Sequence, residues 1–285
     1  MTWLQPLRRR SASAYRAGRE LDEAIAACRR LAGYGLASTI GYTPAPDERP
    51  RAVADAQLVT LERLAAENLD SHVSVKLSGL RFDERLFGEL VAAAAQAGRS
   101  LHVDALGPET VDATWRLLEN APRDARVGTT LPGRWHRSVE DVALAASLGL
   151  RVRVVKGQWP DLPTNGVDPR RGFLNVVERL RGHPLDVGVA THDVEVLAES
   201  VRRLHAAGTP CTAELYFGLP FRAPALLARQ LGVPVRVYVA YGHAGAPYAA
   251  ADIRRNPAAA WWLVQDLLLG KDKTWLSIRR SSGRR

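Results

Sequence analysis

The sequence contains few cysteines and no long apolar run, and both absences narrow its class. Its two cysteines, Cys28 and Cys211, do not make a disulfide framework, and neither has the spacing of a metal-binding motif. No apolar run reaches the roughly 18 residues that a membrane-spanning helix needs, and the longest, at 258–269, contains Gln265 and Asp266. We therefore expect a cytoplasmic protein, with peripheral contact to a membrane at most.

Lysine is also scarce, although the formal net charge is +9. Arginine supplies nearly all of the positive charge and is concentrated near the two ends of the chain. The regular stacking aromatics of a nucleic-acid-binding surface are missing, so no specific nucleic-acid partner is expected. Two of the four lysines, Lys271 and Lys273, lie in the polar C-terminal segment. The other two, Lys76 and Lys156, lie within apolar β-like runs, where a lysine is unfavourable unless it is paired or functional.

The hydrophobic pattern alternates between short, valine-rich runs and longer amphipathic ones. Short runs of this kind are typical of parallel strands that are covered on both faces. Eight strands are predicted, at 37–42, 72–77, 100–105, 125–131, 150–156, 186–191, 211–216 and 235–240. The predicted helices that follow them are at 51–68, 84–97, 108–120, 139–148, 172–180, 194–207, 223–231 and 247–269.

Eight successive βα units predict an α/β fold, a closed (β/α)₈ barrel of the TIM type, rather than an open doubly wound sheet. No G-x-G-x-x-G motif follows the first predicted strand. We expect the barrel at 35–270, after an N-terminal helical extension at 1–34 and before a basic tail at 271–285. Residues 1–19 contain no acidic residue, as in a mitochondrial presequence, but we favour a basic end that leads into a first helix.

Polar residues end or follow most of the predicted strands. They include Lys76, Ser78, His102, Asp104, Arg153, Lys156, Thr191, His192, Asp193, Glu214, Tyr238, Tyr241 and His243. Singly they have ordinary explanations: Lys76 and Asp104 would form a buried ion pair, and His192 would be a satisfied core histidine. In a barrel, however, the carboxyl ends of the strands meet at one mouth, where active sites are built. Because we expect apolar layers below that mouth, these charges must be paired, bound to a ligand, or both.

Two common kinds of catalytic centre are not predicted. His192 and Asp193 are adjacent rather than spaced for one metal ion, and no H-x-H or E-x-x-H motif lies at another strand end. A nucleophilic serine elbow is also absent. The cations Lys76, Arg153 and Lys156 suit an anionic ligand instead: a pyrophosphate, a carboxylate or a reduced flavin ring.

Taken in order, the strand-end blocks resemble those of the proline dehydrogenase family, from about residue 35 to residue 269. The blocks are S-V-K-L-S at 74–78, V-D at 103–104, R-V-V-K-G at 153–157, A-T-H-D at 190–193 and V-Y-V-A-Y-G at 237–242. The resemblance implies an FAD-dependent enzyme that oxidises a C–N bond of proline or a proline-like amine to an imine. Hydride would pass to FAD, and the electrons would pass on to an acceptor such as a quinone.

The resemblance also implies a role for individual residues. Lys76 and Asp104 would shape the substrate side of the site, and Tyr238 would pack over the substrate ring. Arg153 would lie near the reactive edge of the flavin, where its positive charge stabilises the reduced ring. The rest of the cofactor would be held by Lys156, Gly157, Trp159, Thr191, His192, Asp193 and Glu214.

The sequence departs from the family at the paired arginines of the last helix, which clamp the carboxylate of proline. An ungapped comparison puts Ala251 and Asp252 at those positions, with Arg254 and Arg255 three residues later. Three residues make nearly one helical turn, so these arginines would face roughly the same side, about 4.5 Å further along. A gapped comparison would restore the pair but break neighbouring matches, and we favour the ungapped one. A second departure is Pro132, which stands where a glutamine that contacts the flavin is expected.

Four functions remain open. We favour a dehydrogenase of a proline-like amine whose anionic group is held differently or is absent, because Asp252 disfavours a carboxylate at the clamp. The second is ordinary proline dehydrogenase, with Arg254 and Arg255 reaching back to the carboxylate. The others are a lyase with a Schiff base on Lys156 or Lys76 and a non-catalytic flavin-binding barrel that has lost its substrate site.

Overall fold

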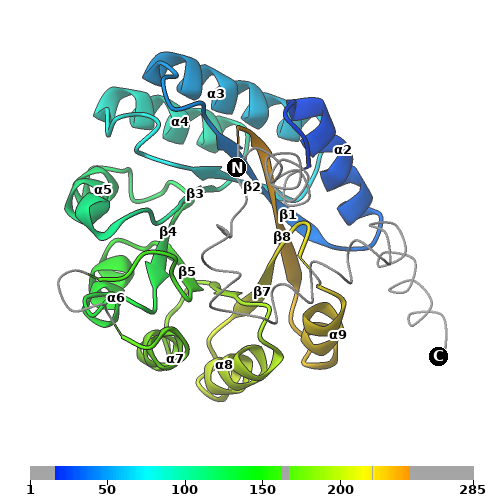
Figure 1. Cartoon of the computed structure of the whole chain (residues 1–285), viewed down its shortest axis with the longest axis vertical. Helices are drawn as coiled ribbons and strands as arrows, with labels where there is room; N and C mark the ends of the chain where they lie inside the picture. Colours follow the sequence, from blue (N-terminus) through cyan, green and yellow to red (C-terminus); the bar gives the residue numbers. More distant parts are fainter. Residues whose placement is uncertain (1–16, 162–166, 220, 244–285) are drawn as a thin grey trace, which may run out of the picture.

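A computed structural model of the chain describes residues 17–161, 167–219 and 221–243. Within them, eight parallel strands close into a barrel in sequence order, and β8 pairs with β1. Figure 1 shows the strands as an inner ring surrounded by helices. The predicted TIM-type (β/α)₈ barrel is therefore confirmed. No helix in the described ranges is long and apolar enough to cross a membrane.

All eight predicted strands are present, with ends that differ from the prediction by a few residues at most. The strands are β1 (Ala37–Thr43), β2 (Ser71–Val75), β3 (Leu101–Val103), β4 (Val127–Pro132), β5 (Arg151–Val155), β6 (Val187–Ala190), β7 (Cys211–Tyr216) and β8 (Val235–Gly242). The helices are α2 (Leu21–Ala32), α3 (Pro50–Ala66), α4 (Glu84–Gln96), the 3₁₀ turn η1 (Pro108–Thr110), α5 (Val111–Glu119), α6 (Ser138–Ser147), α7 (Pro169–Arg179), α8 (Val194–Ala206) and α9 (Arg222–Gln230). The helix predicted at 247–269 lies outside the described residues.

Local sequence explains where several helices begin and end. Asp83 and Asp193 cap α4 and α8, since each carboxylate accepts a hydrogen bond from a backbone N–H in the first turn. Gly208 and Gly232 follow α8 and α9 with φ angles of 68° and 72°, a left-handed conformation that glycine adopts without steric cost. These signals mark the ends of α4, α8 and α9.

Helix α2 covers the seam between the last and first strands. It packs against both β8 and β1, as Figure 1 shows, and buries Ile25 and Leu31 completely. The salt bridge between Arg63 and Asp22, 2.9 Å long, joins it to α3. The described part of the predicted N-terminal extension thus belongs to the outer helical ring. The proposed boundary at residue 34 stays a prediction.

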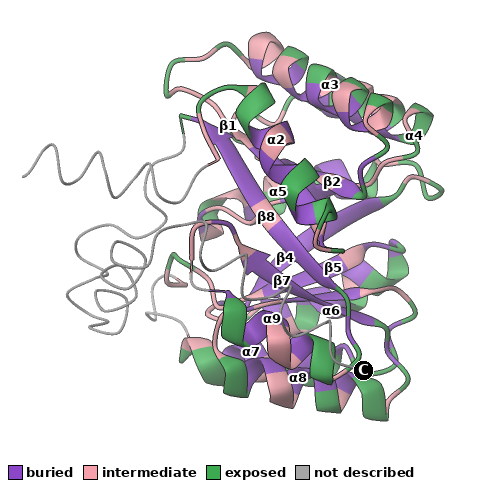
Figure 2. Ribbon diagram, turned by 90° about the vertical axis from the view of Figure 1, so that its right-hand side faces the viewer, coloured by how far each residue is buried: buried purple, intermediate pink, exposed green. Residues whose placement is uncertain are grey.

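The two faces of the strands differ in polarity. Figure 2 shows the strands buried and the outer faces of the helices exposed. Apolar positions such as Val73, Val103 and Val154 belong to the hydrophobic core, whereas the alternate positions carry polar or charged side chains that reach across the barrel. The expectation of apolar layers inside the barrel is therefore wrong, and the apolar core lies between the strands and the helices.

Glycines on the inner face make room for these polar side chains. A Cβ atom on Gly41 would collide with the hydroxyl of Tyr238, and one on Gly188 would collide with the carboxylate of Glu214. A Cβ atom on Gly128 would lie 2.5 Å from Nδ1 of His102. Each glycine therefore allows a long polar side chain from another strand to enter the barrel.

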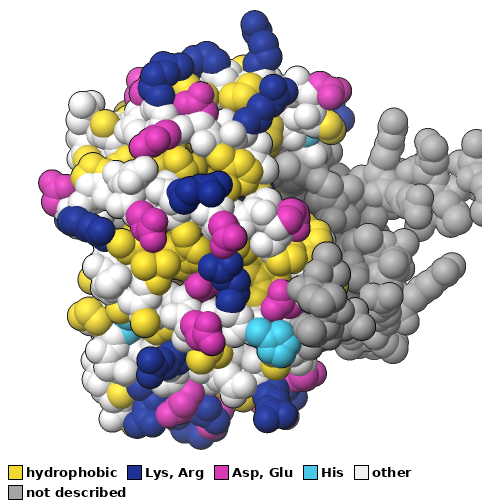
Figure 3. Space-filling model, turned by 90° about the vertical axis from the view of Figure 1, so that its left-hand side faces the viewer, with side chains coloured by type: hydrophobic (Ala, Val, Ile, Leu, Met, Phe, Trp, Pro, Cys, Tyr) yellow, Lys and Arg dark blue, Asp and Glu magenta, His cyan; other side chains and the backbone are white. Residues whose placement is uncertain are grey.

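Charges of both signs are interspersed on the face shown in Figure 3. Ion pairs join neighbouring helices, as between Arg51 of α3 and Glu89 of α4. That face has no continuous basic surface of the kind that attracts nucleic acid.

Candidate active site

A buried ion network lies inside the barrel and is built around Arg153 of β5. Its Nε donates a hydrogen bond of 2.6 Å to Oε2 of Glu214 on β7, and its Nη1 donates one of 3.0 Å to Oδ1 of Asp104 after β3. Neither β3 nor β7 neighbours β5, so both bonds cross the interior, the first of them past Gly188 of β6. The side chain of Arg153 is only 5% exposed, and its position is therefore fixed by these two carboxylates.

Asp104 is the meeting point of four side chains. Its carboxylate accepts hydrogen bonds from Ser74 Oγ at 2.5 Å and Tyr238 OH at 2.7 Å, besides those from Arg153 and from Lys76 Nζ at 3.3 Å. Burial raises the pKa of Asp104, but the charges of Lys76 and Arg153 outweigh it and hold the pKa below its usual value. Asp104 is thus an ionised carboxylate that orients its four partners.

Lys76, which follows β2, and Tyr238 of β8 face each other across the intervening strand β1. The ammonium of Lys76 donates a hydrogen bond of 3.0 Å to the hydroxyl of Tyr238 and lies 5.7 Å from the centre of its ring. Burial lowers the pKa of Lys76, but Tyr238 and Asp104 raise it by more, so the group stays protonated. A protonated amine is not a nucleophile, and this argues against a Schiff base on Lys76.

Tyr216 adds an aromatic wall that the sequence reasoning missed. Its ring stacks on Tyr238 with 5.2 Å between the ring centres and an angle of 14°, and the two residues are register partners on β7 and β8. Because stacking restricts rotation of both rings, it holds Tyr238 in place above the network.

The network contains as many acids as bases. Arg151 extends it towards the amino ends of the strands, since its guanidinium pairs with Glu214 at 2.7 Å and with Asp186 at 2.6 Å. The bases Lys76, Arg151 and Arg153 thus balance the acids Asp104, Asp186 and Glu214. The described network therefore offers no unpaired cation to a substrate carboxylate.

A second group of residues lies after β5 and β6. Lys156 Nζ pairs with Oδ2 of Asp193 at 2.9 Å, and the Lys156 side chain is 40% exposed. The backbone N–H of Asp193 donates a hydrogen bond of 3.1 Å to Oγ1 of Thr191, and Nε2 of His192 accepts one of 2.9 Å from the backbone N–H of Tyr216. This group places the accessible ammonium of Lys156 beside the beginning of α8, where the carboxylate of Asp193 is the anion that pairs with Lys156 and caps the helix.

Gly157 and Trp159 continue this second group. Gly157 has a φ angle of 91°, and a Cβ atom there would lie 2.9 Å from Cβ of Pro132. Glycine is therefore required both by the backbone conformation and by the neighbouring proline ring. Trp159 is 41% exposed, and its carbonyl accepts a hydrogen bond of 3.0 Å from Nε1 of Trp135.

The residues fit a flavin in part. Nη2 of Arg153 is buried and has no hydrogen-bond partner among the described residues, so it is a donor available to a ring nitrogen or carbonyl. Lys156 and Thr191 supply groups suited to phosphate or ribose oxygens. Pro132 offers no side-chain hydrogen bond at the position where a glutamine was expected. Both oxygens of Glu214 are taken by arginines, so its contribution to cofactor binding would be through Arg153.

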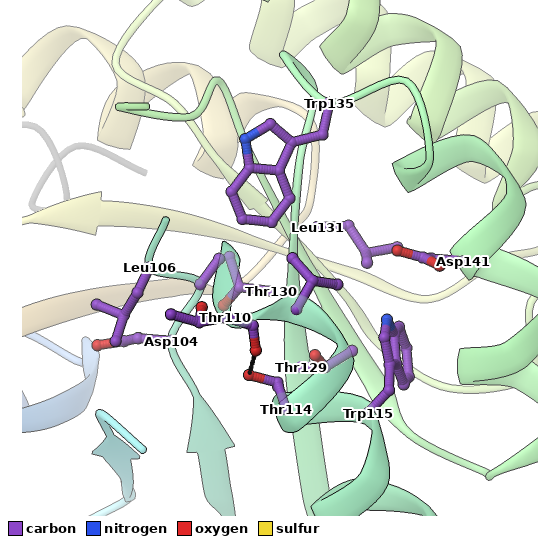
Figure 4. A pocket seen from close by; sticks show the side chains of 12 residues that line it. Asp104, Leu106, Thr110, Thr114, Trp115, Thr129, Thr130, Leu131, Trp135 and Asp141 are labelled. Carbon is purple, nitrogen blue, oxygen red and sulfur yellow. Dashed lines mark hydrogen bonds between the residues drawn. The ribbon is translucent and has the colours of Figure 1, made fainter. Parts of the chain in front are cut away.

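A small cavity lies behind Asp104, between β3–β4 and helices α5–α6. Figure 4 shows Asp104 at one side of it and Asp141 at the other, with Trp115 and Trp135 among the lining residues. Its volume of 20 Å³ has room for about one water molecule. This cavity is too small for an amino acid or a flavin.

The structure brings together five of the predicted residues, namely Lys76, Asp104, Arg153, Glu214 and Tyr238, and places Lys156, Gly157, Trp159, Thr191, His192 and Asp193 at the next strand ends. Arg254 and Arg255, like Ala251 and Asp252, lie outside the described residues.

The sequence reasoning missed Ser74 and Arg151, which each precede a predicted residue by two positions. That spacing puts both on the same strand face as Lys76 and Arg153, and it was a usable signal. The described residues contain no group of three or more histidines, cysteines or acids arranged for a metal ion.

Fold and site together define a TIM-type barrel with an ion network in its interior and a second polar group, around Lys156 and Asp193, at neighbouring strand ends. No family model matches the chain. Proline dehydrogenase 1 of Bacillus subtilis is 24% identical over 269 residues, which cover 88% of this chain and 89% of that protein. The proline dehydrogenase of Deinococcus radiodurans is 27% identical over 276 residues, 89% of each chain.

Solved structures agree in fold. Proline utilization A from Bdellovibrio bacteriovorus, inactivated by N-propargylglycine, superposes with a TM-score of 0.73 at 15% identity and covers 86% of this chain. The match spans 32% of that longer protein, and at this identity it supports the fold alone. With the two sequence relatives, the predicted resemblance to the proline dehydrogenase family is confirmed: the chain is a distant relative of the proline dehydrogenases.

Proposed function

We propose that the chain is an FAD-dependent oxidoreductase that oxidises a C–N bond of proline or a proline-like amine to an imine. The observation that carries the proposal is the network in which Asp104, just after β3, holds Lys76, Arg153 and Tyr238 together inside the barrel. The two relatives named proline dehydrogenase support the same reaction. The electron acceptor, such as a quinone, stays an expectation, as does a cytoplasmic location.

Each residue of the network has a role that follows from its contacts. The ring of Tyr238, held by Tyr216 and by hydrogen bonds to Lys76 and Asp104, forms one wall of the substrate site. Nη2 of Arg153, which has no partner among the described residues, would donate a hydrogen bond where negative charge develops. Lys156, Thr191 and the first turn of α8 would hold the phosphate and ribose groups of FAD. FAD supplies the hydride acceptor, and the chain's own residues supply alignment and electrostatic stabilisation.

Recognition of the substrate carboxylate depends on residues outside the network. Every cation of the network is paired with an acid, so a carboxylate would have to displace one of them. The bases placed by sequence for that purpose are Arg254 and Arg255, with Asp252 opposing them. We therefore favour a proline-like amine whose anionic group is held by a rearranged clamp or is absent.

An absorption spectrum and a substrate panel test this function. The purified protein, incubated with FAD and freed of excess, should show the visible absorption of oxidised flavin. Under anaerobic conditions L-proline or a cyclic amine without a carboxylate, such as pyrrolidine, should bleach that absorption. Arg153→Met should slow bleaching by about 10²-fold, the usual effect of losing one hydrogen-bond donor to developing negative charge.

The outcomes separate the alternatives. A protein that stays colourless with FAD excludes the flavoenzyme. Flavin that binds but is bleached by no amine or amino acid indicates the non-catalytic barrel. Bleaching by L-proline that is lost in Arg255→Ala indicates ordinary proline dehydrogenase. A covalent adduct trapped by borohydride on Lys156 would indicate the lyase.

A further inference from the structure

The end of the barrel opposite the proposed active site contains a second cavity. It lies at the amino ends of β2, β3 and β4, has a volume of 270 Å³, and is lined by Asn68, Asp70, Ser71, His72, Gly98, Arg99, Ser100 and Arg126. This volume is close to the lower end of the range, roughly 300–1,000 Å³, of pockets that hold small molecules. Polar donors form most of the lining.

Two of the lining side chains have buried nitrogen atoms without a partner among the described residues. One is Nε of Arg99, and the other is Nδ1 of His72. The guanidinium of Arg99 is anchored by a hydrogen bond of 3.0 Å from Nη2 to the carbonyl of Leu64, so it is held at the cavity. A buried N–H donor without a partner is unfavourable, so an acceptor that reaches it would stabilise the bound state.

The charge around the cavity favours an anion. Arg99 and Arg126 are the lining bases, and the single lining acid, Asp70, is already paired with Arg236 at 2.9 Å. Burial, together with the charges of Arg236 and Arg151, lowers the pKa of His72 to about 2, against the opposing effect of Glu214. The imidazole is therefore neutral and can donate or accept, while the arginines around it provide the positive potential.

We propose that this cavity is a binding site for a small oxyanion with more than one negative charge, of the phosphate or phosphate monoester class. The guanidinium groups of Arg99 and Arg126 would bind its oxygens, and the hydroxyls of Ser71 and Ser100 and the imidazole of His72 would supply further hydrogen bonds. The site is separate from the flavin-binding mouth, which lies at the other ends of the strands. It would thus allow a metabolite other than the substrate to bind the same domain.

The test uses inorganic phosphate as the probe and the imidazole NMR signals of His72, assigned with a His72→Gln variant. Phosphate is titrated into the full chain at constant ionic strength, with chloride as the matched anion and without added FAD. We expect a saturable shift of the His72 signals with phosphate and none with chloride. Arg126→Gln should weaken phosphate binding about tenfold, the factor that corresponds to 1.4 kcal/mol.

The substitution at Arg126 should leave the fold intact, because its side chain is exposed and only its backbone carbonyl takes part in the sheet. Arg179→Gln, which removes an exposed arginine of α7, is the matched control and should bind phosphate like the wild type. No saturable shift up to about 10 mM phosphate, tenfold above a millimolar Kd, would overturn the proposal. Equal weakening in both arginine variants would do so as well. Neither result depends on flavin binding, so the proposed oxidoreductase function is tested separately.

Discussion

The stability of the barrel should depend strongly on Glu214, and the substitution Glu214→Gln tests this. Glu214 is 4% exposed and its two oxygens accept hydrogen bonds from Arg153 and Arg151, at 2.6 and 2.7 Å. Glutamine keeps the shape but removes the charge, which leaves two buried guanidinium groups with less compensation. Breaking a buried ion pair by removing one partner costs about 3–5 kcal/mol. Because glutamine still accepts one hydrogen bond, we expect a loss of about 3 kcal/mol.

The measurement is the free energy of unfolding in urea, an uncharged denaturant that does not screen the network. Glu178→Gln is a matched control, since Glu178 also pairs with two arginines, Arg181 and Arg203, but its side chain is 46% exposed. Exposed pairs contribute about 0–1 kcal/mol, so this variant should lose less than about 1 kcal/mol. The combined variant Arg151→Gln with Glu214→Gln restores neutrality and should be more stable than the sum of the two single losses predicts. Equal losses for Glu214→Gln and Glu178→Gln would refute the role of the buried network.

Three further outcomes follow from the same geometry. Asp104 and Glu214 both have a pKa below their unfolded values of about 3.9 and 4.3, because the charges of Lys76, Arg153 and Arg151 outweigh burial. The stability that these two carboxylates contribute is therefore present above those values and is lost as the pH falls below them. The free energy of unfolding in urea, measured from pH 7 to pH 3, should decline, and Glu214→Gln should make that decline shallower. Gly188→Ala should destabilise the fold by about 1–3 kcal/mol, because its Cβ would collide with the Glu214 carboxylate. Gly88→Ala is the control: Gly88 lies on the exposed face of α4, where a Cβ meets nothing within 4 Å. This substitution should stabilise the fold by about 0.5–1 kcal/mol. Tyr238→Phe removes the hydroxyl that joins Lys76 to Asp104 and should slow anaerobic flavin bleaching about tenfold, as the loss of one hydrogen bond to a charged group predicts; an unchanged rate would show that the hydroxyl has no part in the reaction.

The arrangement of the barrel could be predicted from the sequence because each strand carries its own local signal. Valine-rich runs recur in most of the strands, glycine or aspartate residues mark the ends of several helices, and the spacing of these signals was sufficient to count eight strands. The ends of the strands depend on pairing and were less accurate. Strand β2 ends at Val75, since its last partner on β3 is Val103, whereas β8 extends to Gly242, which pairs with Thr43.

The polar interior could not be predicted in the same way, because its contacts join strands that are not neighbours. The pairing of Arg153 with Glu214 requires a glycine at position 188 of the intervening strand, and no local pattern links these three positions. The alternation of Arg151 with Arg153 was visible and indicated a shared face of β5, but sequence alone did not indicate which acids on other strands these arginines pair with. Which side chains meet across the barrel interior is decided by the closure of the whole sheet, not by the sequence of any one strand.

The charge balance of the network bears directly on how the substrate is recognised. A neutral cluster in which every acid and base is paired can orient a substrate through hydrogen bonds and aromatic contact, but it does not attract a carboxylate over a neutral group. Carboxylate selectivity must therefore come from a cation outside the cluster. The ungapped comparison predicts Ala251 and Asp252 at the positions of the family's paired arginines, and the next cations in the sequence are Arg254 and Arg255. A comparison of flavin bleaching rates for L-proline and pyrrolidine consequently tests whether Arg254 and Arg255 bind the carboxylate. A strong preference for L-proline that Arg254→Ala and Arg255→Ala abolish would show that they do. Equal rates for the two amines would show that the neutral network alone selects the amine.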